Sequence, residues 1–229
     1  MLIFKKILIL FFIASAASGQ ETWNGKDGLK QLTQSQFKND FYQLANFYQA
    51  QINPFYCSAA SSVIILNAIN QTNIYKQEDF FNQKTDKIKL KSIIENQQKN
   101  AKEEFDPGLS LGDLAKILTN VYNLKITINY AENSSENAIN NFRKIVMKIT
   151  NDNDKFLLIN FDGKIIKNKT NGHISPLVAY DKTSDSVLIM DVALHKNQWF
   201  WTSLTNLYKA MNSKDGEHYR GFLIVENKL

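Results

Sequence analysis

Four residues of the chain, Gln51, Cys57, His173 and Asp191, have the side chains from which a covalent acyl transfer can be built. Cys57 is the only cysteine among the 229 residues, and a cysteine thiolate attacks carbonyl carbon atoms. It follows Pro54 at the expected start of an apolar helix, where unpaired backbone N–H groups and the helix dipole stabilise a negative charge. Taken alone, Cys57 is better explained as a small hydrophobic side chain in a core, so a catalytic interpretation depends on the other three residues.

His173 and Asp191 occupy two successive predicted strands, residues 173–180 and 186–193. A simple hairpin whose turn is centred on residue 182 would place the two side chains directly opposite each other on one face, with their Cβ atoms ~5 Å apart. An aspartate between apolar neighbours also needs a partner if it is buried. The pair is therefore expected to join an imidazole to a carboxylate, either to activate a nucleophile or as an ion pair that closes a hairpin.

Gln51 lies shortly before the cysteine, in a segment that contains a proline. Its side-chain amide and the backbone N–H of Cys57 would form a two-donor oxyanion hole, although the same residue can also be interpreted as a solvated loop residue. The remaining histidines, His195 and His218, have polar neighbours and are expected to be solvated. With three histidines, one cysteine and no HExxH sequence, the chain offers no metal-binding cluster to propose.

The elements that would position these residues are predicted from the apolar pattern, which indicates helices from residue 28 to about residue 118. Residues 56–69 are apolar on most sides, so this helix should be buried, and Ser110 is expected to cap a later helix. Strands are predicted at residues 125–131, 155–161, 173–180, 186–193 and 221–226, with a short helix at residues 136–150. Helices followed by antiparallel strands indicate an α+β domain.

Residues 1–19 have the features of a secretory leader. Lys5 and Lys6 precede an apolar run, and small residues precede an expected cleavage near residues 18–20. The apolar run is shorter than the ~20 residues that a spanning helix needs, and no later segment is long and apolar enough to span a membrane. We therefore expect an exported protein, which would be periplasmic, secreted or lumenal, with residues 20–229 as a single domain.

The composition of the mature chain excludes some classes of partner. The leader contains two of the 27 basic residues, so 25 basic residues remain against 22 acidic ones. This weak positive balance is spread along the chain and is not interleaved with aromatic residues, so nucleic acid is not an expected partner. A single cysteine cannot form an internal disulfide. Three Asn-x-Ser/Thr sequences, which matter only in a host that glycosylates, begin at Asn70, Asn133 and Asn168.

Three segments of the chain resemble the phytochelatin synthase family. The segment FYQAQINPFYCSAASSVIILNAI looks like the family's signature, in which a Gln and a Pro precede an aromatic–Cys pair and a buried helix ends in Leu-Asn-Ala. GHISPLVAYDKTSDSVLIMDVA is similar to the family's block from Gly-His-Phe-Ser-Pro to Asp-Val-Ala, and YRGFLIV is similar to its Arg-Gly-Phe strand. The resemblance covers about residues 28–225, and the order Gln, Cys, His, Asp matches throughout.

The resemblance implies a papain-like fold, in which a helical lobe carries the cysteine, an antiparallel β lobe carries the histidine and the aspartate, and the active site lies between them. It implies attack on the Cys–Gly bond of glutathione, release of glycine, and a γ-glutamylcysteinyl thioester that passes to water or to a second glutathione, which gives phytochelatin. By position, Cys57 would be the nucleophile and His173 the general base and then the general acid. Asp191 would orient His173, and Gln51 would be an oxyanion donor.

The resemblance also implies that three further residues of this chain contact the substrate. Arg220, with Asp215, would hold the charged γ-glutamyl end, because an arginine fork pairs bidentately with a carboxylate; the alternative is a surface arginine beside an edge strand. Tyr56 is expected to contact the substrate as well. No cofactor is expected to bind tightly, since cadmium or zinc would stimulate activity as metal–glutathione thiolates. Glutathione is thus the expected partner, as donor and acceptor, and a homodimer is left open.

Two positions, Ser58 and Leu194, depart from the family, which has Gly after the cysteine and Arg after Asp-Val-Ala. Leu194 puts in doubt the contact that this Arg would make, but not the triad. The chain also ends soon after the domain, without a Cys-rich extension, which favours hydrolysis of glutathione over sustained chain building. Two alternatives stay open: a papain-like peptidase that processes leader peptides, and a non-catalytic module that binds thiols or metal thiolates.

Overall fold

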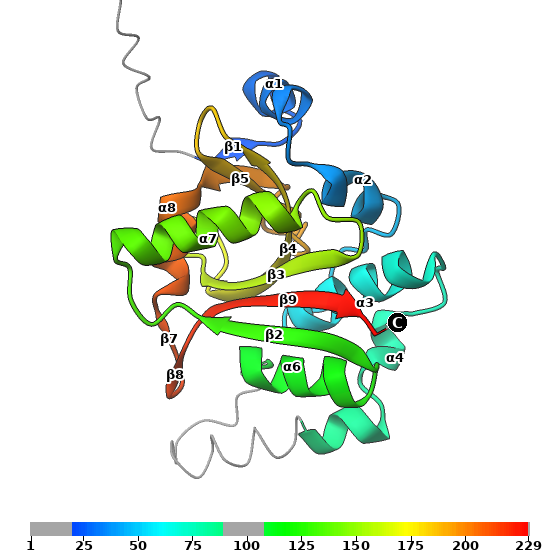
Figure 1. Ribbon diagram of the computed structural model, residues 1–229. Coiled ribbons are helices and arrows are strands. Elements are labelled where there is room, and N and C mark those ends of the chain that lie inside the picture. Colours follow the sequence, from blue (N-terminus) through cyan, green and yellow to red (C-terminus); the bar gives the residue numbers. More distant parts are fainter. Residues whose placement is uncertain (1–19, 89–107, 229) are drawn as a thin grey trace, which may run out of the picture.

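The structure is a computed structural model that describes residues 20–88 and 108–228. Its central element is a seven-stranded antiparallel sheet with the strand order β1-β6-β5-β4-β3-β9-β2 (Figure 1). A separate two-stranded ribbon precedes the last strand. The sheet strands are β1 (Glu21–Thr22), β2 (Leu124–Tyr130), β3 (Lys155–Asp162), β4 (Gly172–Asp181), β5 (Ser186–Ile189), β6 (Phe200–Ser203) and β9 (Gly221–Asn227), and the ribbon consists of β7 (Lys214–Asp215) and β8 (His218–Tyr219).

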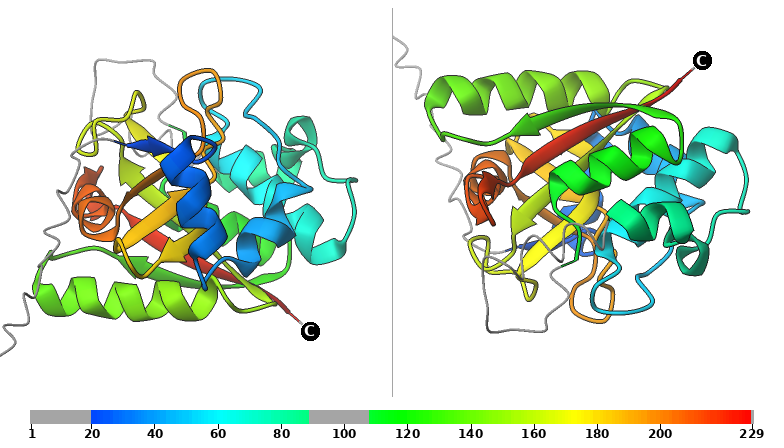
Figure 2. Two further views of the ribbon diagram at one scale, coloured as in Figure 1. Left: turned by 90° about the horizontal axis from the view of Figure 1, so that it is seen from above. Right: turned by 90° about the horizontal axis from the view of Figure 1, so that it is seen from below.

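Helices cover both faces of this sheet (Figures 1 and 2). The helices that precede β2 in the chain pack on one face, around a core that contains Leu66, Leu114 and Val178. Two later helices pack on the opposite face, around a core that contains Phe142 and Leu207. The first group comprises α1 (Lys26–Gln34), α2 (Asn39–Ala45), α3 (Cys57–Asn70), α4 (Gln77–Phe80) and α6 (Leu111–Asn120), and the second comprises α7 (Glu136–Ile149) and α8 (Leu204–Met211).

The central strands are buried on both faces, as β3 illustrates. Phe156 and Leu158 belong to the first core, whereas Leu157 and Ile159 belong to the second, because successive side chains of a strand point to opposite faces. The sequence of a strand that is buried on both faces is a continuous apolar run, and residues 155–161 have this pattern. The predicted combination of helices with an antiparallel sheet is confirmed.

Helix α3 lies inside the molecule, between the sheet and the other helices of its face. All its residues from Ser58 to Ala68 are buried, so it has no polar face, as its composition predicted. The helix ends at Gln71, which adopts a left-handed conformation with φ 49° and ψ 47°. Its first residue is Cys57, so the fold puts the only cysteine at a helix N-terminus.

Most predicted elements are present, with ends that differ by a few residues. The predicted cap of α6 is confirmed, because Ser110 Oγ accepts a hydrogen bond from the backbone N–H of Asp113 at 3.1 Å. The strand predicted at residues 186–193 ends earlier, at Ile189. Strand β6 and helix α8 were not predicted, because they are too short for a clear apolar period.

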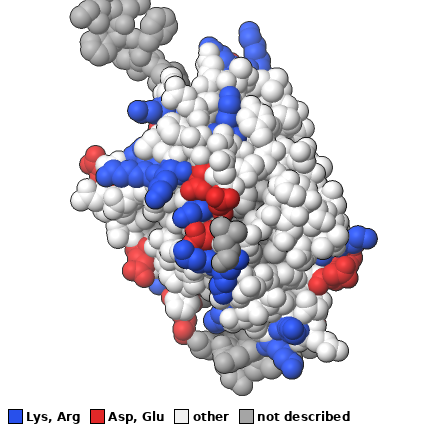
Figure 3. All heavy atoms as spheres, turned by 45° about the vertical axis from the view of Figure 1, so that its right-hand side comes forward, with Lys and Arg blue, Asp and Glu red and all other residues white. Residues whose placement is uncertain are grey.

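Some expectations fall outside the part of the chain that the structure describes: the leader at residues 1–19, and residues 89–107 of the predicted helical half. Among the described helices, none combines the length and the apolar character needed to cross a membrane. On the face drawn in Figure 3, many Lys and Arg side chains lie next to acidic ones. Glu226 forms ion pairs with both Lys125 and Lys155.

Candidate active site

The N-terminal half of α3 lies against the beginning of β4. Residues 172–175 of β4 pair with β3, whereas the pairing with β5 runs from Leu177 onward. On the free edge that remains, Ser61 Oγ donates a hydrogen bond of 3.0 Å to the backbone oxygen of Ile174. Because Ser61 lies one turn after Cys57 and Ile174 directly follows His173, this bond holds the cysteine and the histidine side by side.

The thiol of Cys57 is half-buried and has several hydrogen-bonding neighbours. Burial alone would raise the pKa of Cys57, but the hydrogen bond and charge of His173, together with the backbone N–H groups of Ile174 and Ser58, outweigh burial and lower this pKa below its usual value. Donors that face the sulfur favour the thiolate over the thiol. These surroundings are those of a reactive cysteine more than those of an inert core residue.

His173 and Asp191 form the contact that the sequence predicted. His173 Nε2 lies 2.8 Å from Asp191 Oδ1, and the two side chains are 4% and 0% exposed. Asp191 Oδ1 also accepts a hydrogen bond of 2.8 Å from the backbone N–H of Ala193. Burial would lower the pKa of His173, but the charge and hydrogen bond of Asp191, followed by those of Cys57, raise it to about 10. These contacts favour the charged form of the imidazole and, beside it, the thiolate form of Cys57.

The predicted register of this pair is wrong, although the contact is right. The ladder joins Leu177 to Ile189, with a bulge between Leu177 and Ala179. Continued in the same register, it places Asp191 across from Ser175 instead of His173. A shift of two residues keeps a side chain on the same face of the sheet, so Asp191 still reaches the imidazole diagonally.

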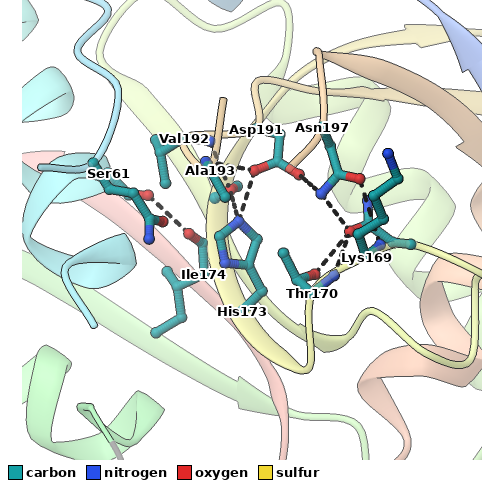
Figure 4. Close-up of polar contacts among 12 residues, drawn as sticks. Ser61, Lys169, Thr170, His173, Ile174, Asp191, Val192, Ala193 and Asn197 are labelled. Atoms are coloured by element: carbon teal, nitrogen blue, oxygen red, sulfur yellow. Dashed lines mark hydrogen bonds and ion pairs between the residues drawn. The ribbon is translucent and has the colours of Figure 1, made fainter. Parts of the chain in front are cut away.

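Ser175, which the sequence analysis did not single out, is a third member of this contact. Its Oγ lies 3.1 Å from His173 Nε2 and accepts a longer hydrogen bond, 3.4 Å, from the backbone N–H of Val192. The signal in the sequence was its spacing, since residues two apart on a strand share a face. Asn197 also joins the site, because its Nδ2 donates to Asp191 Oδ2 (Figure 4). The same Nδ2 donates to Asn168 Oδ1. The sequence analysis noted Asn168 only as a glycosylation sequence and did not note Asn197.

Gln51 is brought to the site by its backbone. Its N–H donates to the backbone oxygen of Val192 at 2.8 Å, which fixes the loop before α3 against the residues that follow Asp191. The side chain is only 9% exposed, so the interpretation as a solvated loop residue is wrong. Its Nε2 donates to the backbone oxygen of Asn53 at 2.9 Å, which leaves one hydrogen of the amide for another acceptor.

Arg220 and Asp215 also meet, beside the histidine. Arg220 Nη1 lies 3.2 Å from Asp215 Oδ2 and donates to Asn160 Oδ1 at 2.8 Å, while Asn160 Nδ2 donates to Asp215 Oδ2 at 2.9 Å. The guanidinium covers Gly172, the neighbour of His173, so closely that a Cβ there would come within 2.8 Å of both its terminal nitrogens. With 12% of its side chain exposed, Arg220 is not the surface arginine of the alternative interpretation.

The other residues that the sequence analysis named lie as follows. Tyr56 is the N-cap residue of α3 and packs its ring against Phe81, with 5.0 Å between ring centroids. Ser58 is buried, whereas Leu194 is about half exposed. His195 and His218 are exposed, as expected. Among the described residues, no group of three or more His, Cys, Asp or Glu side chains is arranged to hold a metal ion.

Comparisons with known proteins agree on one family. The family model of phytochelatin synthase matches residues 14–222. The chain is 29% identical over 213 residues to glutathione gamma-glutamylcysteinyltransferase 1 of Lotus japonicus, which covers 88% of this chain and 38% of that protein. It is 27% identical over 191 residues to the protein of the same name from Arabidopsis thaliana, with 81% and 36% covered. With the glutathione gamma-glutamylcysteinyltransferase of Schizosaccharomyces pombe, 24% of 208 residues are identical, with 88% and 47% covered. The chain thus spans less than half the length of these relatives, and it belongs to the phytochelatin synthase family.

Proposed function

We propose that the protein is a thiol-dependent acyltransferase that cleaves the Cys–Gly bond of glutathione. The observation that carries this proposal is the buried contact of His173 with Asp191 at 2.8 Å beside a thiol whose pKa is lowered. A nucleophile, a base and a group that orients the base are the parts that acyl transfer needs. The names of the relatives supply the substrate, since they are called glutathione gamma-glutamylcysteinyltransferases.

We also propose that the fold is papain-like. Two features support this proposal: a nucleophile at the N-terminus of the buried helix α3, and a histidine on the antiparallel sheet against which that helix packs. The imidazole uses Nε2 for Asp191, which leaves Nδ1 for the thiol. The helices of the second half, α7 and α8, would then be additions on the far face of the sheet.

In the first step, the thiolate of Cys57 attacks the carbonyl carbon of the Cys–Gly bond, and the carbonyl electron pair moves to the oxygen. The backbone N–H of Cys57 and the free amide hydrogen of Gln51 would stabilise this oxyanion. When the intermediate collapses, the C–N bond breaks and the imidazolium of His173 gives its proton to the departing amine of glycine. A γ-glutamylcysteinyl thioester remains on Cys57.

In the second step, the acyl group leaves Cys57. The neutral imidazole of His173 takes a proton from water, which gives γ-glutamylcysteine, or from the amino group of a second glutathione, which gives phytochelatin. Cadmium or zinc would enter with the substrate, as a glutathione thiolate complex. An exported location and a cleaved leader at residues 1–19 are part of the same proposal and rest on the sequence alone.

Arg220 and Asp215 would recognise the γ-glutamyl end of the substrate. That end carries an α-carboxylate and an α-ammonium group, and the adjacent guanidinium and carboxylate have the complementary charges. Their position next to Gly172, and so next to His173, would set the distance between the recognised end and the bond that is cleaved. Tyr56, directly before the nucleophile, would contact the cysteinyl part.

The decisive experiment incubates the mature protein with glutathione, with and without cadmium, and measures glycine, γ-glutamylcysteine and phytochelatin. We expect glycine release by the wild type and a loss on the order of 1,000-fold or more in Cys57→Ala. The matched control is Asn206→Ala, an exposed side chain on α8. Undiminished release by Cys57→Ala would contradict the proposal. Cleavage of peptides without a γ-glutamyl group, with no glycine from glutathione, would favour a peptidase instead.

Recognition by charge is tested separately with Arg220→Lys and Asp215→Asn. Each keeps the size of the side chain but loses the bidentate fork or the negative charge, so KM for glutathione should rise about tenfold or more, the effect of ~1.4 kcal/mol of lost binding. The alkylation rate of Cys57 in the absence of glutathione serves as the control and should change little. An unchanged KM in both variants would remove these two residues from the substrate site.

A further inference from the structure

The carboxylate of Asp191 is held at both of its oxygens. Oδ1 accepts hydrogen bonds from His173 and from the backbone of Ala193, each of 2.8 Å. Oδ2 accepts one of 3.3 Å from Asn197 Nδ2, and no other described residue donates to it. Figure 4 shows the carboxylate between the histidine on one side and Asn197 on the other. The orientation of Asp191 therefore depends on Asn197 as well as on its bonds at Oδ1.

A tight turn brings Asn197 back over Asp191. The backbone N–H groups of Lys196 and Asn197 both donate to the oxygen of Ala193, at 2.7 and 3.0 Å. Both hydrogens of the Asn197 amide are used, since Nδ2 also donates to Asn168 Oδ1 at 2.6 Å. Its Oδ1 accepts a weaker bond, 3.4 Å, from the backbone N–H of Lys169. The amide is thus fixed in one orientation.

Asn168 fixes the far end of this chain of hydrogen bonds. Its Oδ1 accepts from the backbone N–H and from the hydroxyl of Thr170, both at 2.9 Å, as well as from Asn197. The Asn168 side chain is buried, and its Nδ2 has no partner among the described residues. Because the two bonds from Thr170 fix the position of this oxygen, Asn168 presents an acceptor and not a donor to Asn197.

We propose that Asn197, held by Asn168, is a positioning residue that keeps the carboxylate of Asp191 turned toward His173. This proposal rests on the proposed function, in which the imidazole works with Cys57. Rotation of a carboxylate about its last bond is soft, so two bonds at Oδ1 do not prevent Asp191 from tilting. A donor at Oδ2 that is itself fixed by three further contacts removes that freedom.

The consequence is measurable at the cysteine. If Asp191 tilts away, the imidazolium of His173 loses support from its strongest partner, and the thiolate of Cys57 loses the charge that stabilises it. The pH of half-maximal alkylation of Cys57 should therefore rise. In glycine release, kcat should fall while KM changes little, because Asn197 touches neither Arg220 nor Asp215.

The test compares iodoacetamide alkylation of Cys57 between pH 4 and 10 in the wild type, Asn197→Leu and Asn197→Gln. Leucine has nearly the shape of asparagine without its donors. We expect the midpoint in Asn197→Leu to rise by about one pH unit or more, which is the scale of one charged hydrogen bond, and kcat for glycine release to fall about tenfold. Asn197→Gln, which keeps the amide, should recover part of both. Asn206→Ala is the matched control.

A purely structural role for Asn197 gives a different result. The unfolding temperature and the fraction of active protein would then fall, but the alkylation midpoint would stay in place, and this outcome overturns the proposal. If Asn197→Leu does not fold, Asn168→Ala takes its place, since it removes the support of Asn197 but not its bond to Asp191. An unmoved midpoint there overturns the proposal equally. A wild-type midpoint at the ordinary value of a thiol would instead contradict the triad, so the two failures are distinguishable.

Discussion

Cys57 and His173 stabilise each other's charges at a position where neither charge would be stable alone. Burial opposes both charged forms, since removing an ion from water is unfavourable. Side by side, a thiolate and an imidazolium offset that penalty, and Asp191 adds the charge that favours protonation of the imidazole. The pair should therefore be present between the lowered pKa of the thiol and the raised pKa of the imidazole, about 10.

This window gives a prediction for His173→Ala. In the wild type, alkylation of Cys57 should reach half its maximal rate well below the ordinary thiol pKa, and glycine release should decline only as the pH approaches about 10. Without the imidazole, burial is no longer opposed by its charge, so the alkylation midpoint should move to the ordinary value or above it. The control is His195→Ala, which removes an exposed histidine. Identical pH profiles in wild type and His173→Ala would contradict a thiolate–imidazolium pair.

At this scale, the sequence identified the residues whose type is unusual for their surroundings. A lone cysteine at a helix start and an aspartate inside an apolar run are conspicuous, and both were found. Asn197 and Asn168 were not, because an asparagine in a polar segment is ordinary, and its importance depends on a turn that brings it over Asp191. The role of Ser175 could be predicted only in part, because the sequence shows its spacing from His173 but not its hydrogen bond.

At the scale of elements, the lengths of the strands decide where the site forms. Because β5 ends at Ile189 and pairs with β4 only from Leu177, the first residues of β4 are free to bind α3. A longer β5, such as residues 186–193 would give, would compete with Ser61 for the backbone oxygen of Ile174 at that edge. The sequence could not predict the shorter strand, because residues 186–193 are mostly apolar, and such a run looks the same whether it pairs in a ladder or only packs in the core.

Helix α2 contains a buried acid that the proposed mechanism does not use. Asp40 is fully buried, neither carboxylate oxygen has a partner among the described residues, and burial, followed by repulsion from Asp152, raises the pKa of Asp40 well above its usual value. In the unfolded chain this group ionises near pH 3.8, whereas in the folded protein it keeps its proton to higher pH. The contribution of Asp40 to the free energy of unfolding is therefore largest below pH 3.8 and falls as the pH rises toward its folded pKa.

The variant Asp40→Asn should remove this pH dependence. Relative to the wild type, its free energy of unfolding should increase by about 1.4 kcal/mol per pH unit from pH 4 upward, until the folded pKa is passed. Urea unfolding at a series of pH values measures the difference. Asp154→Asn, at an exposed acid, is the control and should follow the wild type. Parallel stability curves for Asp40→Asn and the wild type would show that Asp40 is ionised in the folded protein.

At the scale of the molecule, the site joins segments that are far apart in the chain. Gln51 and Cys57 come from the helical half, and His173 and Asp191 from the strand-rich half. The spacing of apolar residues changes along the sequence from a helical to a strand-like period, and this change predicted the two halves. Successive strands joined by short turns then indicated an antiparallel sheet. It did not predict that α7 and α8 cover the second face, because the pairing of distant faces depends on packing and not on the local period.

The lone cysteine should make the protein sensitive to oxidised glutathione. A thiolate that attacks a carbonyl also attacks a disulfide: Cys57 would bond to one sulfur of oxidised glutathione, the S–S bond would break, and the other glutathione would leave as a thiolate. No second cysteine among the 229 residues can reverse this mixed disulfide, so an external thiol must do it.

We therefore predict that oxidised glutathione inactivates glycine release, adds the mass of one glutathionyl group to the protein, and does so faster in the pH range where Cys57 is a thiolate. Dithiothreitol should restore activity and mass together. Full activity in excess oxidised glutathione, with no added mass, would contradict this prediction. A protein built in this way would respond to the ratio of reduced to oxidised glutathione as well as to the amount of the proposed substrate.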